Sequence, residues 1–351
     1  MNENLKLQWE NLVKEMPKLR IREAAKHLKV SEAELLATKL GPSVKLLKPD
    51  WSSFLLNSTN LGYVMALTRN ESCVHERKGI YKNVSVNGQT ALVVGEDIDL
   101  RIFLKDWKYG FYVEEPRENH MMCSFQFFDS RGEAVHKIYQ TEKSELNGWE
   151  LTKAQFIDET QTFAKPSAET IIKTETNDPK EIPAFLNAWS QLEDTHDFFS
   201  LIRKFSYSRE FSLKAASGKF SFPISTNDFL NLMEKTNKLD QEIMIFVGNP
   251  GMIQIHTGKI QKFEPMGPWF NVLDPEFNLH LRTDQVESVW IVDKPTKDGL
   301  VTSVELFDNE GNLILQMFGK RKPGIAQSET WFQLTRSYIN KITEELNPSL
   351  I

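Results

Sequence analysis

The chain has 351 residues, of which 40% are hydrophobic and 26% charged. This length corresponds to two domains of about 150 residues or to one unusually large domain, and the composition excludes an intrinsically disordered chain. Lys and Arg number 42 against 48 Asp and Glu, so the formal net charge is -6. That balance excludes a whole-molecule basic field for nucleic acid or anionic lipid.

Cysteine content and hydropathy exclude further classes of protein. The two cysteines, Cys73 and Cys123, are too few for a disulfide framework and lack the spacing of a redox or zinc motif. The first residues are polar and charged, and no apolar run approaches the roughly 20 residues needed to span a bilayer. We therefore expect a cytoplasmic protein without membrane insertion. The chain is rich in large aromatic and flexible apolar side chains, with 23 Phe, 10 Met and 8 Trp.

The first half begins with helical periodicity and continues with strand-like runs. Residues 2–40 are expected to form three helices, and Ser31 with Glu34 forms a capping box for the third. Runs rich in Val, Ile, Phe and Tyr follow, and a helix is expected at 145–158. The expected strands are 51–58, 63–69, 73–79, 99–105, 110–115 and 123–139, the last with a hairpin turn at 128–132.

The second half shows the same sequence of patterns. An aperiodic stretch from 158 to 183, rich in Thr, Lys, Pro and Glu, predicts a linker before it. Helices are expected at 183–206, 226–238 and 327–346. The expected strands are 242–248, 252–258, 269–274, 277–282, 288–294 and 303–319.

A constant offset relates the two halves. Asn70 and Asn249, Pro116 and Pro295, and further identical pairs between residues 70 and 132 and the second half all differ by 179. We therefore predict an α+β fold made by tandem duplication of one unit, each with a large, mainly antiparallel β-sheet flanked by helices. The expected boundaries are residues 1–165 for the first repeat, 166–182 for the linker and 183–351 for the second repeat.

Familiar catalytic motifs are missing from the sequence. It contains neither a dinucleotide fingerprint nor a Walker loop, and neither H-E-x-x-H nor G-x-S-x-G. The seven histidines do not pair with Asp, Glu or Cys at the spacing of a familiar zinc site. The sequence does not exclude a catalytic triad assembled from residues distant in the chain, although nothing in it points to one.

One histidine lies in an apolar helical pattern. His196 continues a stripe at spacings of four and three, which consists of Phe185, Trp189, Leu192, His196, Phe199 and Arg203. One interpretation is a buried histidine satisfied by a backbone carbonyl. The other is a metal or haem ligand, because a neutral imidazole on a rigid helix among aromatic residues suits the proximal side of a haem iron.

Several other residues fit a haem site or an ordinary structural role. Arg101, inside an alternating strand pattern, either lies on the surface or projects into a cavity as a donor. Cations at 209, 294 and 320–322 are either solvated charges or partners for propionates. Met244, Phe246, Trp290 and Phe318 are either core residues or walls of a cofactor pocket.

The sequence resembles a known family along nearly its whole length. The runs that carry the resemblance are 194–213, 242–258, 268–281, 294–308 and 318–321, with 99–107 in the first half. They look like the cytoplasmic haem-utilisation proteins of Gram-negative bacteria, the HemS/ChuS-type hemin-degrading or haem-trafficking factors.

The resemblance implies roles for individual residues. His196 matches the proximal ligand of the haem iron and Arg101 a distal catalytic arginine. His75 matches a histidine proposed as an additional ligand, and its pattern predicts partial exposure. Phe318 stands where a Tyr is expected in relatives, which removes a hydroxyl from one propionate contact. Residues matched to propionate contacts or to the pocket frame are Arg209, Lys294, Gln316 and Arg321, and those matched to its apolar wall are Met244 and Phe246.

The duplication bears on the number of sites. Subtracting 179 takes His196 to Pro17, and adding 179 takes Arg101 to His280, so the two repeats do not carry equivalent sites. We therefore expect one haem in a cleft between the repeats, with His196 and Arg101 on opposite faces.

The function implied by this resemblance is to receive imported haem and to degrade it, with ring opening and release of iron. An external reductant such as NADPH would be needed, because the chain lacks a flavin or nicotinamide motif. The expected partners are haem and an inner-membrane haem transporter, a reductase or a haem oxygenase. The alternative is a non-catalytic haem chaperone, trafficking or storage protein that delivers haem to a separate haem oxygenase.

Residues 19–35 also resemble a helix-turn-helix, with basic residues on the first helix. The second helix carries Glu32 and Glu34, which suit a phosphate-lined groove poorly. Nucleic acid is therefore not an expected partner.

Overall fold

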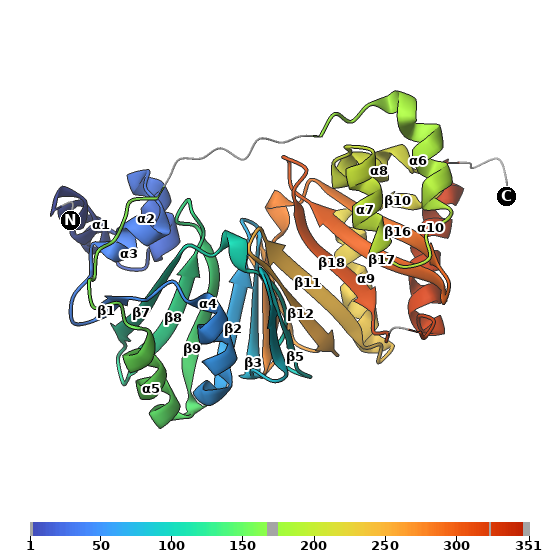
Figure 1. Cartoon of the computed structure of the whole chain (residues 1–351). Coiled ribbons are helices and arrows are strands. Elements are labelled where there is room, and N and C mark those ends of the chain that lie inside the picture. The colour runs from blue at the N-terminus through green and yellow to red at the C-terminus, as the bar shows by residue number, and fades with distance from the viewer. Residues whose placement is uncertain (1–2, 167–174, 323, 347–351) are drawn as a thin grey trace. The chain divides into compact units, whose positions relative to one another are not determined.

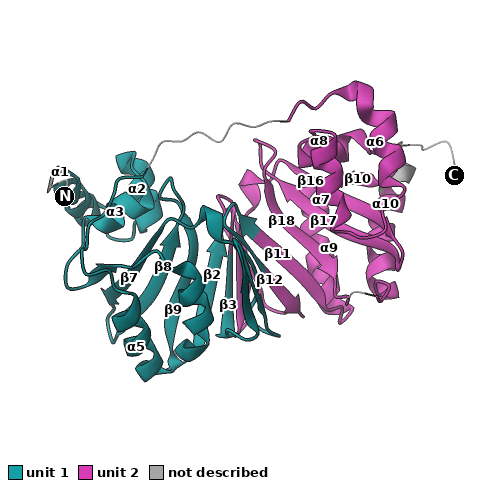
Figure 2. Cartoon of the chain, in the orientation of Figure 1, with its two compact units in different colours: residues 1–69, 75–171, 248–254 teal, residues 70–74, 172–247, 255–351 magenta. Residues whose placement is uncertain are grey.

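The computed structural model describes residues 3–166, 175–322 and 324–346 (Figure 1). Its chain divides into two compact units (Figure 2). Unit 1 comprises residues 1–69, 75–171 and 248–254, and unit 2 comprises residues 70–74, 172–247 and 255–351. Residues 167–174 of the expected linker lie outside the described residues, and the contiguous repeat boundaries stay a prediction.

Unit 1 begins with the three helices that periodicity predicted. Leu5, Trp9 and Leu12 are buried against the second and third helices. Ser31 and Glu34 form the predicted capping box, with each side chain accepting a hydrogen bond from the backbone N–H of the other residue. The third helix is almost wholly buried against β-strands, so packing on the sheet accounts for it. The helices are α1 (Glu3–Glu15), α2 (Ile21–Leu28) and α3 (Glu32–Ala37).

The strands of unit 1 form a run in the order β1-β7-β8-β9-β2-β3 and a meander in the order β6-β5-β4. The pairs from β1 to β9 and within the meander are antiparallel, as expected. Their bounds are β1 (Val44–Leu46), β2 (Gly62–Arg69), β3 (Cys73–Ile80), β4 (Val84–Asn87), β5 (Thr90–Val94), β6 (Asp99–Phe103), β7 (Tyr109–Pro116), β8 (Met121–Phe128) and β9 (Ala134–Ser144).

One expected strand of unit 1 is a helix. Residues 51–58 form α4 (Trp51–Asn57) and the start of the 3-10 turn η1 (Ser58–Leu61), so the strand prediction is wrong. Its buried residues, Trp51, Phe54 and Leu55, have the i, i+3, i+4 spacing of a helix, and the Asp50 side chain caps the first turn. The expected helix near 145–158 is α5 (Leu146–Phe156), and η2 (Leu104–Asp106) follows β6. Both α4 and α5 pack on the same sheet face in one core.

Unit 2 repeats the order of elements. The strands follow β10-β16-β17-β18-β11-β12, with a meander β15-β14-β13. The helices are α6 (Ile182–Trp189), preceded by the turn η3 (Pro179–Glu181), α7 (Asp197–Lys204), α8 (Arg209–Ala215), α9 (Thr226–Lys238) and α10 (Glu329–Leu346). The strands are β10 (Ser221–Ile224), β11 (Ile243–Asn249), β12 (Met252–Gly258), β13 (Phe263–Met266), β14 (Trp269–Leu273), β15 (Phe277–Arg282), β16 (Ser288–Thr296), β17 (Gly299–Phe307) and β18 (Leu313–Gly319), with η4 (Thr283–Gln285) after β15.

The single helix expected over 183–206 is wrong, because the chain forms α6 and α7 with a turn between them. Most residues of that turn, from 190 to 196, are polar, and backbone carbonyls of α6 accept hydrogen bonds from the N–H groups of Ser190 and Leu192 as it ends. The apolar stripe is therefore interrupted where His196 was placed.

Alternate residues of β16 and β17 divide between two cores. Ile291 and Val304 pack with α9 and α10, whereas Trp290 and Val292 pack with α6, α7 and α8. Successive side chains of a strand point to opposite faces, so the two groups of helices cover opposite faces of this sheet. The strands β18 and β11 continue the same sheet.

Each unit incorporates a turn from the other repeat. In unit 1, the Asn249 amide donates to the backbone oxygens of Arg69 (3.0 Å) and Val135 (2.8 Å). In unit 2, the Asn70 amide donates to the backbone oxygen of Ile314 (2.7 Å). Asn249 differs from Asn70, and Ile314 from Val135, by the offset of 179, so the hydrogen bonds repeat as the sequence does. In the described ranges, no helix combines the length and apolar character needed to cross a membrane.

Candidate functional site

A buried carboxylate gathers three of the predicted site residues of unit 2. Arg209, at the start of α8, donates through Nε (2.6 Å) and Nη2 (2.9 Å) to the two carboxylate oxygens of Glu305 on β17. Lys294 Nζ on β16 (2.8 Å) and Gln316 Nε2 on β18 (3.0 Å) donate to Oε1 of the same carboxylate. The Ser303 hydroxyl donates to it as well. Glu305 therefore fixes the positions of Arg209, Lys294 and Gln316.

The electrostatics of this cluster follow from burial. Glu305 is fully buried, which opposes its charged form, but Arg209 and Lys294 hold its pKa far below the ordinary value. Burial lowers the pKa of Lys294, and Glu305 acts against this. One carboxylate faces two cations, so the cluster carries one positive charge in excess. Such a charge attracts an anionic group.

Aromatic rings cover the cations. Phe198 on α7 places its ring centroid 5.2 Å from the Arg209 guanidinium carbon and 5.0 Å from Lys294 Nζ. Phe318 on β18 lies 5.8 Å from Lys294 Nζ. These separations fall within the range of cation–π attraction.

The predicted apolar wall residues share one strand pair. In the antiparallel β11–β18 pair, Met244 lies opposite Phe318 and Phe246 lies opposite Gln316. The rings of Phe246 and Phe318 meet edge to face, with centroids 5.3 Å apart. All four side chains are only partly buried, whereas the residues between them lie in the core with α9 and α10. An apolar, partly open sheet face therefore adjoins the cationic cluster.

His196 differs from its expected setting. It is the N-cap residue of α7, and its side chain is 91% exposed, so both the central position in a helix and the buried interpretation are wrong. Oδ1 of Asp194 lies 2.6 Å from the ring Nδ1 and 2.9 Å from the backbone nitrogen of His196. These hydrogen bonds, from the backbone first and then from the ring, hold the pKa of Asp194 below its ordinary value.

The exposed face of α7 continues beyond His196. Phe199 is 58% exposed, and its ring lies 5.7 Å from the Arg203 guanidinium carbon. The neighbouring Phe198 faces inward onto the cationic cluster. α7 therefore carries an exposed imidazole and an exposed ring on one side and reaches the cationic cluster on the other.

The remaining predicted residues have other partners or surroundings. Arg321 is placed 3.9 Å from a carboxylate oxygen of Asp298, in unit 2. Arg101 lies in unit 1 on β6, where it forms an ion pair with Asp99 and stands opposite Leu92 of β5. The expected pairing of Arg101 with His196 around one ligand stays a prediction. His75 is fully buried on β3, so the partial exposure expected for it is wrong.

Sequence reasoning missed Glu305 and Phe198, and it noted Asp194 beside His196 without assigning it a contact. An acidic residue in the middle of the apolar strand 299–307 was a usable signal, because a charge buried in a sheet must be paired. The role of Phe198 had no signal of its own, since it depends on how α7 packs over β16. Asp194 was visible two residues before His196, but the assumed continuous helix directed attention to i, i+3 and i+4 neighbours instead.

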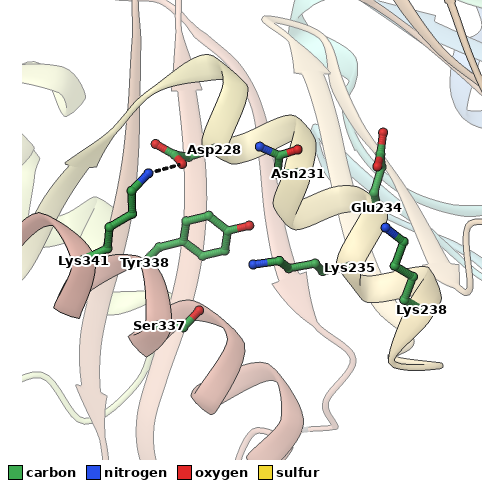
Figure 3. Close-up of a pocket in the computed structure, with 8 residues that line it drawn as sticks. All are labelled: Asp228, Asn231, Glu234, Lys235, Lys238, Ser337, Tyr338 and Lys341. Atoms are coloured by element: carbon green, nitrogen blue, oxygen red, sulfur yellow. Dashed lines mark hydrogen bonds and ion pairs between the residues drawn. The ribbon is translucent and has the colours of Figure 1, made fainter.

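A surface groove on the opposite side of the sheet has another character. It has a volume of about 350 Å³ and lies between α9 and α10. Figure 3 shows Lys341 and Tyr338 of α10 facing α9, with Lys341 Nζ 3.0 Å from Asp228. Its lining is mostly charged and polar, which does not suit a flat apolar ligand. Within the described residues, no group of three or more His, Cys, Asp or Glu side chains converges as a metal site.

Comparison with known proteins identifies related sequences and structures. A family model described as the haemin-degrading HemS.ChuX domain matches residues 29–156 and again residues 206–338. The hemin transport protein HmuS of Yersinia pestis is 35% identical over 343 residues, which cover 97% of this chain and 99% of the relative.

Two solved structures share the fold over nearly the full length. Holo-PhuS, a heme-binding protein from Pseudomonas aeruginosa, is 41% identical, with a TM-score of 0.92, and the match covers 95% of this chain and 98% of PhuS. ChuS, an E. coli heme oxygenase, is 30% identical, with a TM-score of 0.87, and the match covers 96% of this chain and 99% of ChuS. The duplicated α+β architecture expected from the sequence is thereby confirmed.

Proposed function

This chain belongs to the haemin-degrading HemS/ChuX-domain family, and we propose that it binds haem through His196 and degrades it with electrons from an external donor. The observation that carries the proposal is the exposed imidazole of His196, which Asp194 holds at the start of α7, the helix whose Phe198 covers the cationic cluster of unit 2. A single neutral imidazole is a common protein ligand of haem iron.

Other residues of unit 2 suit the rest of the ligand. Haem presents a flat apolar macrocycle and two carboxylates. The partly open face formed by Met244, Phe246 and Phe318 supplies apolar contact area. The excess positive charge at Arg209 and Lys294 favours a carboxylate nearby, and one guanidinium nitrogen of Arg209 is not needed for the bonds to Glu305. Phe318 offers a ring but no hydroxyl, so we assign it to apolar contact.

We assign Arg101 to the reaction and not to retention of haem. Its guanidinium carries a permanent positive charge, which would stabilise negative charge that develops during the reaction. Because the chain lacks a flavin or nicotinamide motif, the electrons would come from a separate donor such as NADPH with a reductase. The Arg101→Ala variant should therefore bind haem with the affinity of the wild type but degrade it more slowly under reducing conditions.

Haem titration tests the binding proposal. We expect the full chain to bind one haem, with a Soret band that saturates at equimolar haem. Saturation at several equivalents, or a spectrum like that of free haem in buffer, would contradict a specific site.

The names of the relatives favour a second candidate, a haem carrier without catalysis. HmuS is named a hemin transport protein, whereas ChuS is named a heme oxygenase. Reductant added to the haem complex in the presence of catalase separates the two. Loss of the Soret band with release of iron and a linear tetrapyrrole supports degradation. An unchanged Soret band, with transfer of haem to an added haem oxygenase, supports the carrier.

A further inference from the structure

The turn between α6 and α7 carries an acid–imidazole pair. Asp194 uses one oxygen, Oδ1, to accept hydrogen bonds from both the backbone N–H (2.9 Å) and the ring Nδ1 (2.6 Å) of His196. Since both bonds reach the same residue, they restrain the ring relative to the start of α7. The imidazole is nevertheless 91% exposed, so this restraint is not a by-product of core packing.

The hydrogen bond determines which ring nitrogen faces outward with its lone pair. An ionised carboxylate only accepts hydrogen bonds, so Nδ1 must carry the proton. In the neutral ring, Nε2 then has a lone pair available to a metal. A carboxylate that accepts from the other nitrogen also makes the ligating nitrogen more basic.

A second acidic residue, Asp197, stabilises the backbone of the same turn. Oδ2 of Asp197 accepts the backbone N–H of Asp194 at 3.2 Å, and the N–H of Asp197 reaches the carbonyl of Asp194 at the same distance. The turn therefore contains one carboxylate, Asp194, that bonds to the ring and one, Asp197, that supports the backbone.

We propose that Asp194 is the positioning residue of His196: it fixes the Nδ1–H tautomer, directs Nε2 outward and strengthens this nitrogen as a ligand of haem iron. The inference rests on the proposed role of His196 and extends it to a residue that does not contact the ligand itself. Its consequence is that Asp194 tunes the strength of the iron–imidazole bond.

Two substitutions separate charge from geometry. Asp194→Asn keeps an oxygen at Oδ1 but removes the negative charge, and Asp194→Ala removes both. Relative to the wild type, we expect Asp194→Ala to lower haem affinity roughly 10- to 100-fold and Asp194→Asn to lower it less. In the ferrous complexes, the iron–imidazole stretching frequency should fall and the midpoint potential should rise, because a less basic ligand donates less charge to the iron.

A measurement without haem gives an independent result. Long-range proton–nitrogen spectra of the ligand-free chain at alkaline pH, where imidazole is neutral, report the tautomer of His196. The wild type should show the proton on Nδ1, and Asp194→Ala should shift the population towards protonated Nε2.

Control variants decide the outcome. Asp197→Ala loosens the turn only, and Glu193→Gln removes an exposed neighbouring charge. Both should retain the wild-type stretching frequency and tautomer.

If the Asp194 variants keep the wild-type frequency, affinity and tautomer while His196→Ala loses binding, the positioning role is refuted but the ligand role stands. If His196→Ala binds haem like the wild type, the ligand role itself fails. If Asp194→Ala and Asp197→Ala change the haem affinity, the stretching frequency and the tautomer equally, Asp194 only stabilises the backbone of the turn and the positioning role is refuted.

Discussion

Glu305 is fully buried between Arg209 and Lys294, so its charge is balanced by contacts that exist only in the folded chain. Two cations and one carboxylate are expensive to remove from water, and five hydrogen bonds to the carboxylate compensate this cost. Because its pKa is depressed on folding, the stabilisation by Glu305 is complete above its ordinary pKa of 4.5 and is lost as the pH falls below that value.

Glu305→Gln removes this charge without changing the size of the side chain. The two cations would then face each other in the interior, and we expect the free energy of unfolding at neutral pH to fall by about 3–5 kcal/mol. Urea unfolding followed by tryptophan fluorescence measures it. Glu242→Gln, which breaks the exposed pair with Lys320, is the matched control and should cost less than about 1 kcal/mol. Equal losses in the two variants would refute the stabilising role of the buried cluster.

His136 provides a second pH-dependent contribution, in unit 1. Its ring is buried, with Nε2 2.6 Å from the Tyr81 hydroxyl and Nδ1 3.1 Å from the Thr68 hydroxyl. Burial lowers the pKa of His136 from 6.5 to about 3. Between these two values the unfolded chain binds a proton that the folded chain does not, so the stability falls as the pH decreases through this window.

The His136→Gln variant should lack that contribution. We expect the free energy of unfolding of the wild type to fall more steeply below pH 6.5 than that of the variant, with a difference in slope approaching 1.4 kcal/mol per pH unit. Urea titrations at a series of pH values measure both slopes. Parallel curves would mean that His136 is protonated equally well in the folded chain.

At the scale of elements, periodicity was informative wherever one face of a segment was buried. It placed the three N-terminal helices, α9 and α10, and most long strands. It failed for α4, where the strand prediction gave weight to residue type over the helical spacing of Trp51, Phe54 and Leu55. It also missed the short strands β1, β4, β5, β10 and β13, since three to five residues carry little periodicity.

The candidate site shows the same limit. Arg209, Lys294 and Gln316 were predicted from resemblance, but their convergence on Glu305 joins α8, β16, β17 and β18. Such contacts depend on the tertiary arrangement and leave no local pattern in the sequence. The exposure of His196 was missed for a simpler reason: a helix break between Trp189 and His196 changes which side chains share a face.

The turns that are incorporated into the other unit depend on asparagine. Oδ1 of Asn249 accepts the N–H groups of Gly251 (3.0 Å) and Met252 (3.2 Å), while its amide donates to two carbonyls. Asn249→Ala should leave these partners unsatisfied and cost about 1–3 kcal/mol of unfolding free energy, measured by urea unfolding. The exposed Asn87→Ala on β4 is a control with an expected change below about 0.5 kcal/mol. No loss in Asn249→Ala would show that the turn holds without its side chain.

At the scale of the whole molecule, duplication explains the architecture but not the site. Within the described residues, both repeats follow the order of three α-helices, a strand, an α-helix, eight strands and a final α-helix. At the offset of 179 that relates the strands, Gln126 stands in the place of Glu305 and Glu115 in that of Lys294. The N-cap residues Ser31 of α3 and Ser208 of α8 differ by 177, so Glu32 stands in the place of Arg209. Unit 1 therefore builds its buried charge cluster from other positions, with the carboxylate of Glu32 on α3 paired with Arg69 of β2 and Lys137 of β9.

That His196 binds the haem iron is tested most directly by haem titration of His196→Ala beside the wild type. A second variant, His120→Ala, removes an exposed histidine of unit 1 and controls for nonspecific coordination. We expect His120→Ala to match the wild type, and His196→Ala to lose at least about 100-fold in affinity, or about 2.8 kcal/mol, with a shifted Soret band. A His196→Ala protein with the wild-type spectrum and affinity would contradict the assignment of His196 as the ligand.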